Sequence, residues 1–230
     1  MNALIGSGFN APSREDFDKK SKFWLNYWIP NLGGREIVIV DNSEAPVPKL
    51  QSAGNVRVIS VNHNLGQVGD VAHIANFLGL QFPKLGGWSM SWILPALIAC
   101  CEQRDFIYFE QDALAFGEWE NQIYADMGAK QLRMAFGDGS RFGSCEQSIF
   151  CIKHDFILEA ITLYMVIDQG DGILLPEKKF EQMERGVPLI GRHTLPGGRN
   201  RPFDFEKLPF YGQKWTPEEL EQLKIMGFIK

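Results

Sequence analysis

The sequence predicts an α/β fold in which helices flank a mostly parallel central sheet. Short apolar runs rich in β-branched residues alternate with segments of helical periodicity. Polar residues follow three of these runs directly, at Asp41, Asn62 and Glu110. Ligands of parallel sheets bind outside the carboxyl ends of the strands, so these positions are candidates for a site. The length of 230 residues suits one domain over 1–230, with 204–230 as a C-terminal extension.

The N-terminal segment predicts a strand followed by a helix. Asn2–Ile5 is short and apolar, which is typical of a first strand. Ser13 precedes Asp16 in a capping-box pattern, so a helix should begin near Arg14. Aromatic residues then recur at helical spacing, and we expect Pro30 to end the helix.

The remaining elements follow from the same two periodicities. Further strands are predicted at Glu36–Val40, Val56–Val61, Phe106–Glu110 and Ser148–Ile152. Helices are predicted at Asp70–Leu80, at Ser91–Gln103 (with a late start at Pro95 as an alternative), at about Asp155–Ile167 and after Thr216. Past Gly191 the chain is predicted to be loop-like until this last helix.

Composition and charge exclude several classes of function. The formal net charge is −5 and no run of Lys or Arg occurs, which argues against nucleic acid and polybasic membrane partners. The uncharged stretch Leu85–Cys101 contains glycines, serines and Pro95, so we expect a buried loop and helix and no transmembrane segment. No signal peptide is evident at the N-terminus.

The four cysteines show no zinc-binding spacing. They are Cys100, Cys101, Cys145 and Cys151. We expect reduced core residues in a cytoplasmic protein.

Glu110-Gln111-Asp112 is the strongest chemical signal. A hydrophobic strand that ends in carboxylates at i and i+2 places both on one face. Such a pair can bind a hard divalent cation, Mn²⁺ or Mg²⁺, that also binds phosphate oxygens.

Three segments, in order, resemble the GT-A family of nucleotide-sugar-dependent glycosyltransferases. Ile37–Ser43 (IVIVDNS) looks like the family's second strand, and Asn62–Asp70 (NHNLGQVGD) is similar to its Asn-x-Gly loop. Phe106–Gly117 (FIYFEQDALAFG) looks like its DxD strand, with Glu110 in the first acidic place. The resemblance, over roughly Ile37 to Phe203, implies a GT-A-like, Rossmann-like domain.

A downstream motif extends the resemblance to glycogenin-like transferases. The segment from His193 to Phe203 is similar to their His-x-x-Gly-x-x-Lys-Pro-Trp motif, with one extra residue, Arg for Lys and Phe for Trp. The resemblance implies that His193 is a third metal ligand, and that Gly197, Arg199 and Arg201 hold the diphosphate. A guanidinium suits phosphate at least as well as an ammonium.

The resemblance also implies a donor site and a reaction. Donor-binding roles fall on Asp41, which would face base and ribose, and on Asn42, Asn64, Gly66 and Glu110. The partners would be a nucleotide-sugar donor and a glycan or other hydroxyl acceptor.

The acceptor hydroxyl needs a general base if the reaction inverts the anomeric centre, and a retaining reaction needs none. The candidates are Asp171, Glu146 and Glu177. We favour Asp171, because its flanking glycines indicate an open loop on the acceptor side.

Three other functions compete with transfer. The segment at 6–11 matches GxGxxA, the fingerprint of NAD-type Rossmann oxidoreductases, but Glu15 and Asp16 in the next helix would repel a dinucleotide. The alternative is a non-catalytic glycosyltransferase-like protein that binds nucleotide or glycan. A nucleotidyltransferase is less favoured, because no Lys-bearing phosphate loop follows the first strand.

Overall fold

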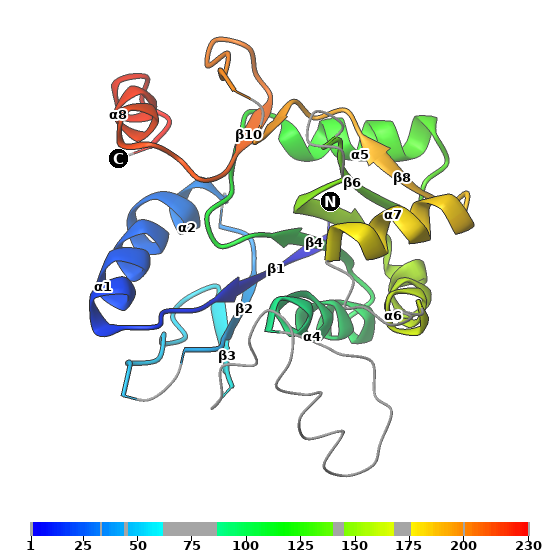
Figure 1. The fold of residues 1–230 in the computed structure, drawn as a ribbon, viewed down its shortest axis with the longest axis horizontal. Coiled ribbons are helices and arrows are strands. Elements are labelled where there is room, and N and C mark those ends of the chain that lie inside the picture. Colours follow the sequence, from blue (N-terminus) through cyan, green and yellow to red (C-terminus); the bar gives the residue numbers. More distant parts are fainter. Residues whose placement is uncertain are drawn as a thin grey trace.

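The computed structural model describes residues 2–32, 34–43, 46–61, 87–139, 145–167, 176–199 and 201–229. Its centre is a seven-stranded sheet in the order β3-β2-β1-β4-β7-β6-β8, which confirms the α/β prediction (Figure 1). The strands are β1 (Ala3–Phe9), β2 (Ile37–Asp41), β3 (Val56–Ser60), β4 (Asp105–Phe109), β6 (Met134–Gly137), β7 (Glu146–Ile152) and β8 (Ile190–His193).

All neighbouring strands of this sheet pair in parallel except β7, which is antiparallel to both β4 and β6. The carboxyl ends of the parallel strands and the first residue of β7 therefore meet at one edge. A second sheet, β5-β10-β9, is formed by Leu114–Phe116, Phe210–Gly212 and Gly197–Gly198.

Helices cover both faces of the central sheet (Figure 1). One layer holds α4 (Gly87–Cys101), α6 (Ile157–Val166) and α7 (Pro176–Gly186). The other holds α1 (Arg14–Phe23), α2 (Ile29–Asn31), α5 (Trp119–Ala129) and α8 (Pro217–Ile225). None of the helices in the described ranges is long and apolar enough to cross a membrane.

Each layer encloses its own apolar core. Trp24, Trp28 and Phe109 belong to the core beneath α1 and α5, and Trp92 and Phe150 belong to the core beneath α4 and α7. All five side chains are almost fully buried. The high aromatic content of the chain is thus used on both faces of the sheet.

The first helix starts as predicted and ends later than predicted. The side chain of Ser13 accepts a hydrogen bond from the Asp16 amide and caps α1. The helix continues through a π-helical segment, Trp24–Trp28, into α2. Pro30 lies in α2, so the predicted end at Pro30 is wrong. Pro30 is tolerated in the first turn of α2, because the N–H that proline lacks would have had no partner within that helix.

The glycines of the GxGxxA segment lie inside β1, where no turn occurs. A Cβ at Gly6 would lie 2.7 Å from the Pro95 Cβ, and one at Gly8 would lie 2.6 Å from the Ser91 Cβ. Both glycines therefore allow α4 to pack closely on β1. The next helix begins only at Arg14. The dinucleotide fingerprint requires a turn and a helix start at its glycines, so the oxidoreductase alternative fails.

Several elements were not predicted. They are β5, α5, β6, α7, β8, β9 and β10. The expectation of a loop past Gly191 is wrong, because β8 continues to His193 and two short strands follow. These strands have two to four residues, too few for an alternating pattern to appear. The helix predicted at Asp70–Leu80 lies outside the described residues.

The C-terminal segment is part of the core. Phe205, Phe210 and Leu223 are buried in the same apolar cluster as Phe109. The predicted cap of the last helix is confirmed, since Thr216 forms a capping box at the start of α8.

All four cysteines are unpaired. Cys145 and Cys151 are buried as expected, but Cys101 is exposed, so the expectation of a core position is wrong there. Cys101 is the last residue of α4, where the helix leaves the core.

Candidate functional site

The predicted acidic pair lies at the carboxyl edge of the central sheet, directly after β4. Trp88 Nε1 donates to Glu110 Oε1 at 3.1 Å, and Gln147 Nε2 lies 3.5 Å from the same oxygen. The Lys214 amide donates to Asp112 Oδ2 at 3.3 Å. Both carboxylates keep partial exposure, so a ligand can reach them.

Gln111, between the two acids, fixes this turn to the rest of the fold. Its carbonyl accepts from Trp24 Nε1 at 3.1 Å, and its side-chain oxygen accepts from the Asn10 amide at 3.3 Å. The turn is therefore anchored to the end of β1 and to the π-helical segment. This anchoring places Glu110 and Asp112 before any ligand arrives.

Glu146 joins the pair from the neighbouring strand. It is the first residue of β7, and β7 runs antiparallel to β4, so it reaches the same edge. Its side chain is buried and accepts from Gln213 Nε2 at 2.9 Å. It also lies close to Gly198, where an added Cβ would lie 2.9 Å from the Glu146 Cγ.

The negative charges of Asp112 and Glu146 both act on Glu110. Burial, with the negative charges of Asp112 and Glu146 adding to it, raises the pKa of Glu110 to about 7. Burial also raises the pKa of Asp112, and the Lys214 amide together with the charges of Lys214 and Arg199 opposes that rise only in part. The site is thus short of positive charge when all three groups are ionised.

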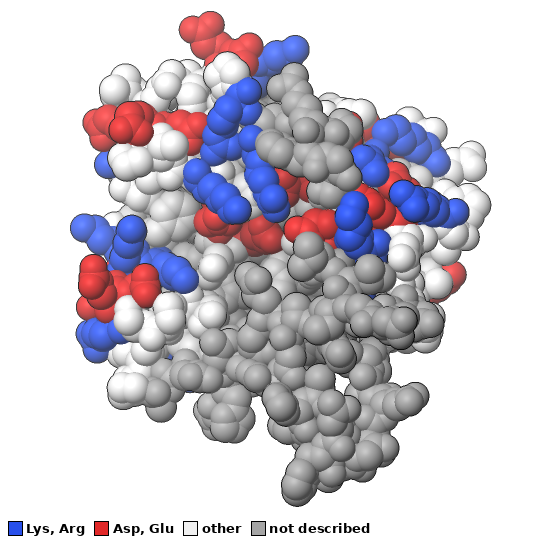
Figure 2. Space-filling model, in the orientation of Figure 1, with Lys and Arg blue, Asp and Glu red and all other residues white. Residues whose placement is uncertain are grey.

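Arg199 provides positive charge beside this cluster. Its Nε lies 3.6 Å from Glu146 Oε2, and one terminal nitrogen lies 3.8 Å from Glu177 Oε1 at the start of α7. The guanidinium is about one-third exposed, so it can also face a ligand. Figure 2 shows acidic side chains in the middle of this face with basic side chains beside them.

The described residues at this edge could hold a divalent cation only together with phosphate or water ligands. Within the described ranges, no three His, Cys, Asp or Glu side chains are grouped so that they could hold a metal ion. Two carboxylates, Glu110 and Asp112, remain as oxygen ligands. Mg²⁺ is commonly bound by one or two carboxylates, with substrate phosphates and water as its other ligands. A cation would also relieve the repulsion that raises the pKa of Glu110.

His193 is not brought to the acidic pair. It ends β8, its side chain is buried, and its Nε2 lies 3.3 Å from the Ile149 carbonyl oxygen. Burial lowers its pKa to about 4, so the imidazole is neutral near pH 7. The expectation of a third ligand at His193 is not met, because the residue lies in a strand and its ring packs against Tyr211.

Arg201 has a structural role in place of the expected diphosphate contact. Its Nε donates to Glu219 Oε1 at 2.8 Å, and its terminal nitrogens donate to the carbonyls of Gly198 and Gln213. The guanidinium also lies 4.1 Å from the centre of the Phe203 ring. These contacts hold α8 to the small sheet and leave little of the guanidinium for a phosphate.

Gly197 allows two strands of the small sheet to lie close together. Its φ is +135°, and a Cβ there would lie 1.7 Å from the Tyr211 carbonyl oxygen. Only glycine therefore allows β9 to pair with β10. The predicted contact of Gly197 with a diphosphate stays a prediction.

Asp41 and Asn42 end β2 in a buried position. The two carboxylate oxygens of Asp41 accept from the Ser43 amide at 2.9 Å and the Leu50 amide at 2.8 Å. Asp41 thus fixes the loop after β2, and it is not the free carboxylate that we expected beside base and ribose.

The other predicted residues, Asn64, Gly66 and Asp171, lie outside the described residues.

Sequence reasoning missed the partners of the acidic groups. Trp88, Gln147, Gln213 and Lys214 were not predicted to contact these acids. Gln147 follows Glu146 directly, but Gln213 reaches the site only because β10 pairs with β5 and β9. No local pattern could have indicated that contact.

Comparisons with solved structures find similar chains at low sequence identity. The structure is similar to that of the galactosyltransferase LgtC solved with donor and acceptor sugar analogues, with a TM-score of 0.43 and 11% identity over 94% of this chain and 87% of that one. It is similar to an active-site mutant of LgtC, with a TM-score of 0.46 and 10% identity over 99% and 96% of the two chains.

A third similar structure is the glycosyltransferase GlyE of Streptococcus pneumoniae, with a TM-score of 0.43 and 8% identity over 95% of this chain and 55% of that one. No protein-family model matches the chain, and no curated protein matches it significantly. At these scores and identities the likeness concerns the path of the chain and carries no conclusion about activity.

Proposed function

We propose that this protein is a glycosyltransferase that moves a sugar from a nucleotide diphosphate donor to an acceptor hydroxyl, with a divalent cation at Glu110 and Asp112. The observation that carries the proposal is the meeting of Glu110, Asp112, Glu146 and Arg199 at the carboxyl edge of the sheet. Carboxylates in unrelieved conflict beside an arginine suit a ligand that brings both a cation and phosphate.

The chemistry concerns charge on a leaving group. When the bond to the anomeric carbon breaks, negative charge builds on the departing diphosphate. A divalent cation, when bound, supplies Lewis-acid stabilisation of that charge. Arg199 adds charge-assisted hydrogen bonds to phosphate oxygens, and the buried Glu146 beside it holds the guanidinium in place.

Glu110 and Asp112 have different tasks in this proposal. Asp112 accepts a hydrogen bond from the Lys214 amide, and the residue is partly exposed, so a cation can approach it. Glu110 is already bonded by Trp88 and has the higher affinity for a proton. We therefore assign Asp112 as the main ligand and Glu110 as the secondary one.

The acceptor hydroxyl of an inverting reaction requires a base, and three carboxylates remain candidates. Glu146 is buried and Glu177 is partly exposed, and both lie against Arg199. Both carboxylates are therefore already ion-paired with a positive group of the protein. Asp171, which lies outside the described residues, remains the proposed base.

Turnover of nucleotide-sugars tests the proposal. We expect release of nucleoside diphosphate that requires Mn²⁺ or Mg²⁺ and stops in EDTA. Asp171→Asn should lower kcat by roughly 10²–10⁴-fold while donor binding stays close to that of the parent. Loss of kcat in Glu146→Gln or Glu177→Gln alone would move the role of base to that residue. Tight, cation-dependent binding without any turnover would favour the non-catalytic alternative.

A further inference from the structure

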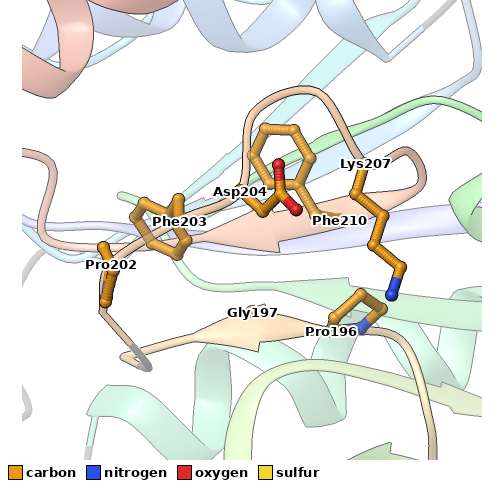
Figure 3. A pocket seen from close by; sticks show the side chains of 7 residues that line it. All are labelled: Pro196, Gly197, Pro202, Phe203, Asp204, Lys207 and Phe210. Carbon is orange, nitrogen blue, oxygen red and sulfur yellow. The ribbon is translucent and has the colours of Figure 1, made fainter.

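The small C-terminal sheet carries a pocket that the proposed donor site does not use. It has a volume of about 270 Å³ and is lined by Pro196, Gly197, Pro202, Phe203, Asp204, Lys207 and Phe210. Figure 3 shows the prolines and aromatic rings around an opening with Lys207 on one side and the β9 backbone at Gly197 below. Pockets for drug-sized ligands start at about 300 Å³, so this one suits a single small ring.

The pocket is formed by side chains that other contacts already hold in place. The Phe203 ring packs on Trp215 at a centroid distance of 5.0 Å, and Arg201 lies over it at 4.1 Å. Phe210 is buried and packs on Phe205. An apolar wall of this kind is formed before a ligand binds, which reduces the entropy lost on binding.

A tight turn presents the two charged groups at the rim. The Lys207 amide donates to the Asp204 carbonyl at 3.2 Å, and Asp204 Oδ1 accepts from the Glu206 amide at 3.2 Å. Neither side chain forms an ion pair with another residue of the described ranges. Their charges cancel, so the pocket has no net preference for an anion or a cation.

This combination of surfaces points to a ligand class. Apolar walls suit the C–H faces of a pyranose, and a carboxylate and an ammonium at the rim can accept from and donate to its hydroxyls. A neutral sugar uses both features, whereas a purely apolar or strongly charged molecule uses only one.

The pocket also lies next to the acidic cluster along the chain. Gly197 lines the pocket, and an added Cβ at the next residue, Gly198, would lie 3.0 Å from Glu146 Oε2. Gly197 and Gly198 are consecutive residues, so their Cα atoms are about 3.8 Å apart. Resting on the proposed function, we infer that this pocket binds a neutral pyranose of the acceptor, and that Asp204 and Lys207 select it through its hydroxyls.

Amide chemical shifts measured by NMR test the inference. The probes are the methyl glycosides of glucose, galactose and N-acetylglucosamine, titrated to about 50 mM into the full chain. We expect at least one glycoside to shift the amides of Gly197 and Lys207. Asp204→Ala and Lys207→Ala should each weaken that binding about 10-fold, because a charged hydrogen bond is lost. Glu206→Ala, an exposed neighbour in the same turn, is the matched control and should bind as the parent does.

Three results would overturn the inference: no shift with any glycoside, shifts that survive both variants, or the same amides moving with a nucleoside diphosphate. A parallel titration with a nucleoside diphosphate and Mg²⁺, which is diamagnetic, reports on Asp112 and Arg199. Nucleotide binding without glycoside binding rejects only the pocket. Glycoside binding without nucleotide binding rejects only the proposed function.

Discussion

The acidic residues at the two ends of β4 have pKa values that are shifted in opposite directions. Burial alone would raise the pKa of Asp105 at the amino end, but hydrogen bonds from the His154 amide, Lys153 and Tyr124 outweigh it and the pKa is lowered. These bonds measure 2.9, 3.1 and 2.9 Å. At the carboxyl end, the side-chain donors to Glu110 within the described ranges are Trp88 and Gln147, and two further carboxylates lie nearby.

The difference separates a stabilising charge from one that is available to a ligand. Asp105 is compensated within the protein, and its ionisation strengthens the folded state. The pKa values of Glu110 and Asp112 are raised in the folded protein, so their ionisation costs stability until a cation or another positive group arrives. Perturbed carboxylates of this kind gather at functional sites, although ion-pair networks perturb pKa values too. The comparison therefore supports the proposed site at the carboxyl edge and can be tested by substitution at each end.

The largest effect is expected at Asp112. Asp112→Asn should weaken cation-dependent binding of a nucleoside diphosphate by roughly 100-fold or more, because the main anionic ligand is lost while the shape is kept. Asp112→Glu should be nearly as harmful, since the added methylene displaces the carboxylate. Isothermal calorimetry in Mn²⁺ measures both variants. Parent-like binding by Asp112→Asn would remove the distinction between the two ends of the strand.

The raised pKa of Glu110 should make the free energy of unfolding depend on pH. Its pKa is raised from 4.5 to about 7 in the folded protein, so the folded state holds this proton where the unfolded chain releases it. The free energy of unfolding should therefore fall by up to about 3 kcal/mol as pH rises from about 4.5 to 7.

Glu110→Gln should remove most of that fall, because the amide does not ionise. Urea unfolding in EDTA at several pH values measures the slope for both proteins. Equal slopes in the two proteins would show that Glu110 is compensated after all.

Substitution of Arg199 should affect nucleotide binding, and substitution of Arg201 should affect stability. Arg199→Ala should weaken nucleoside diphosphate binding by about 1.5–3 kcal/mol with little effect on stability, because its guanidinium is partly exposed and faces the acidic cluster. Arg201→Ala should lower the melting temperature and leave binding of the nucleotide close to that of the parent, because it ties α8 to the small sheet. The opposite pattern would return the diphosphate contact to Arg201.

The smallest effect on binding is expected at Asp105. Asp105→Asn should destabilise the fold by about 1–3 kcal/mol near pH 7, because charged hydrogen bonds to Lys153 and the His154 amide are weakened. This contribution depends on the ionised carboxylate, so it is lost as pH falls through the lowered pKa of Asp105. Thermal unfolding measures the change, and a loss of nucleotide binding in this variant would contradict the comparison.

The sequence predicted the parts of the fold that depend on local pattern. The cap at Ser13, the strand before Glu110 and the capping box at Thr216 follow from neighbours along the chain. The predicted roles of His193, Arg201 and Asp41 rested on a motif resemblance, and each depends on what packs against the residue. Gln213 meets Glu146 across 67 positions of sequence, a contact that only tertiary structure brings about.

Calorimetric titration of nucleoside diphosphates into the unmodified protein, with Mn²⁺ and then with EDTA, tests the central claim most directly. The account predicts that at least one nucleoside diphosphate binds in Mn²⁺ and that EDTA abolishes most of the heat, because phosphate and three carboxylates repel each other without a cation. Full affinity in EDTA, or no binding of any nucleoside diphosphate in Mn²⁺, would contradict the assignment of the carboxyl edge as a cation-dependent donor site.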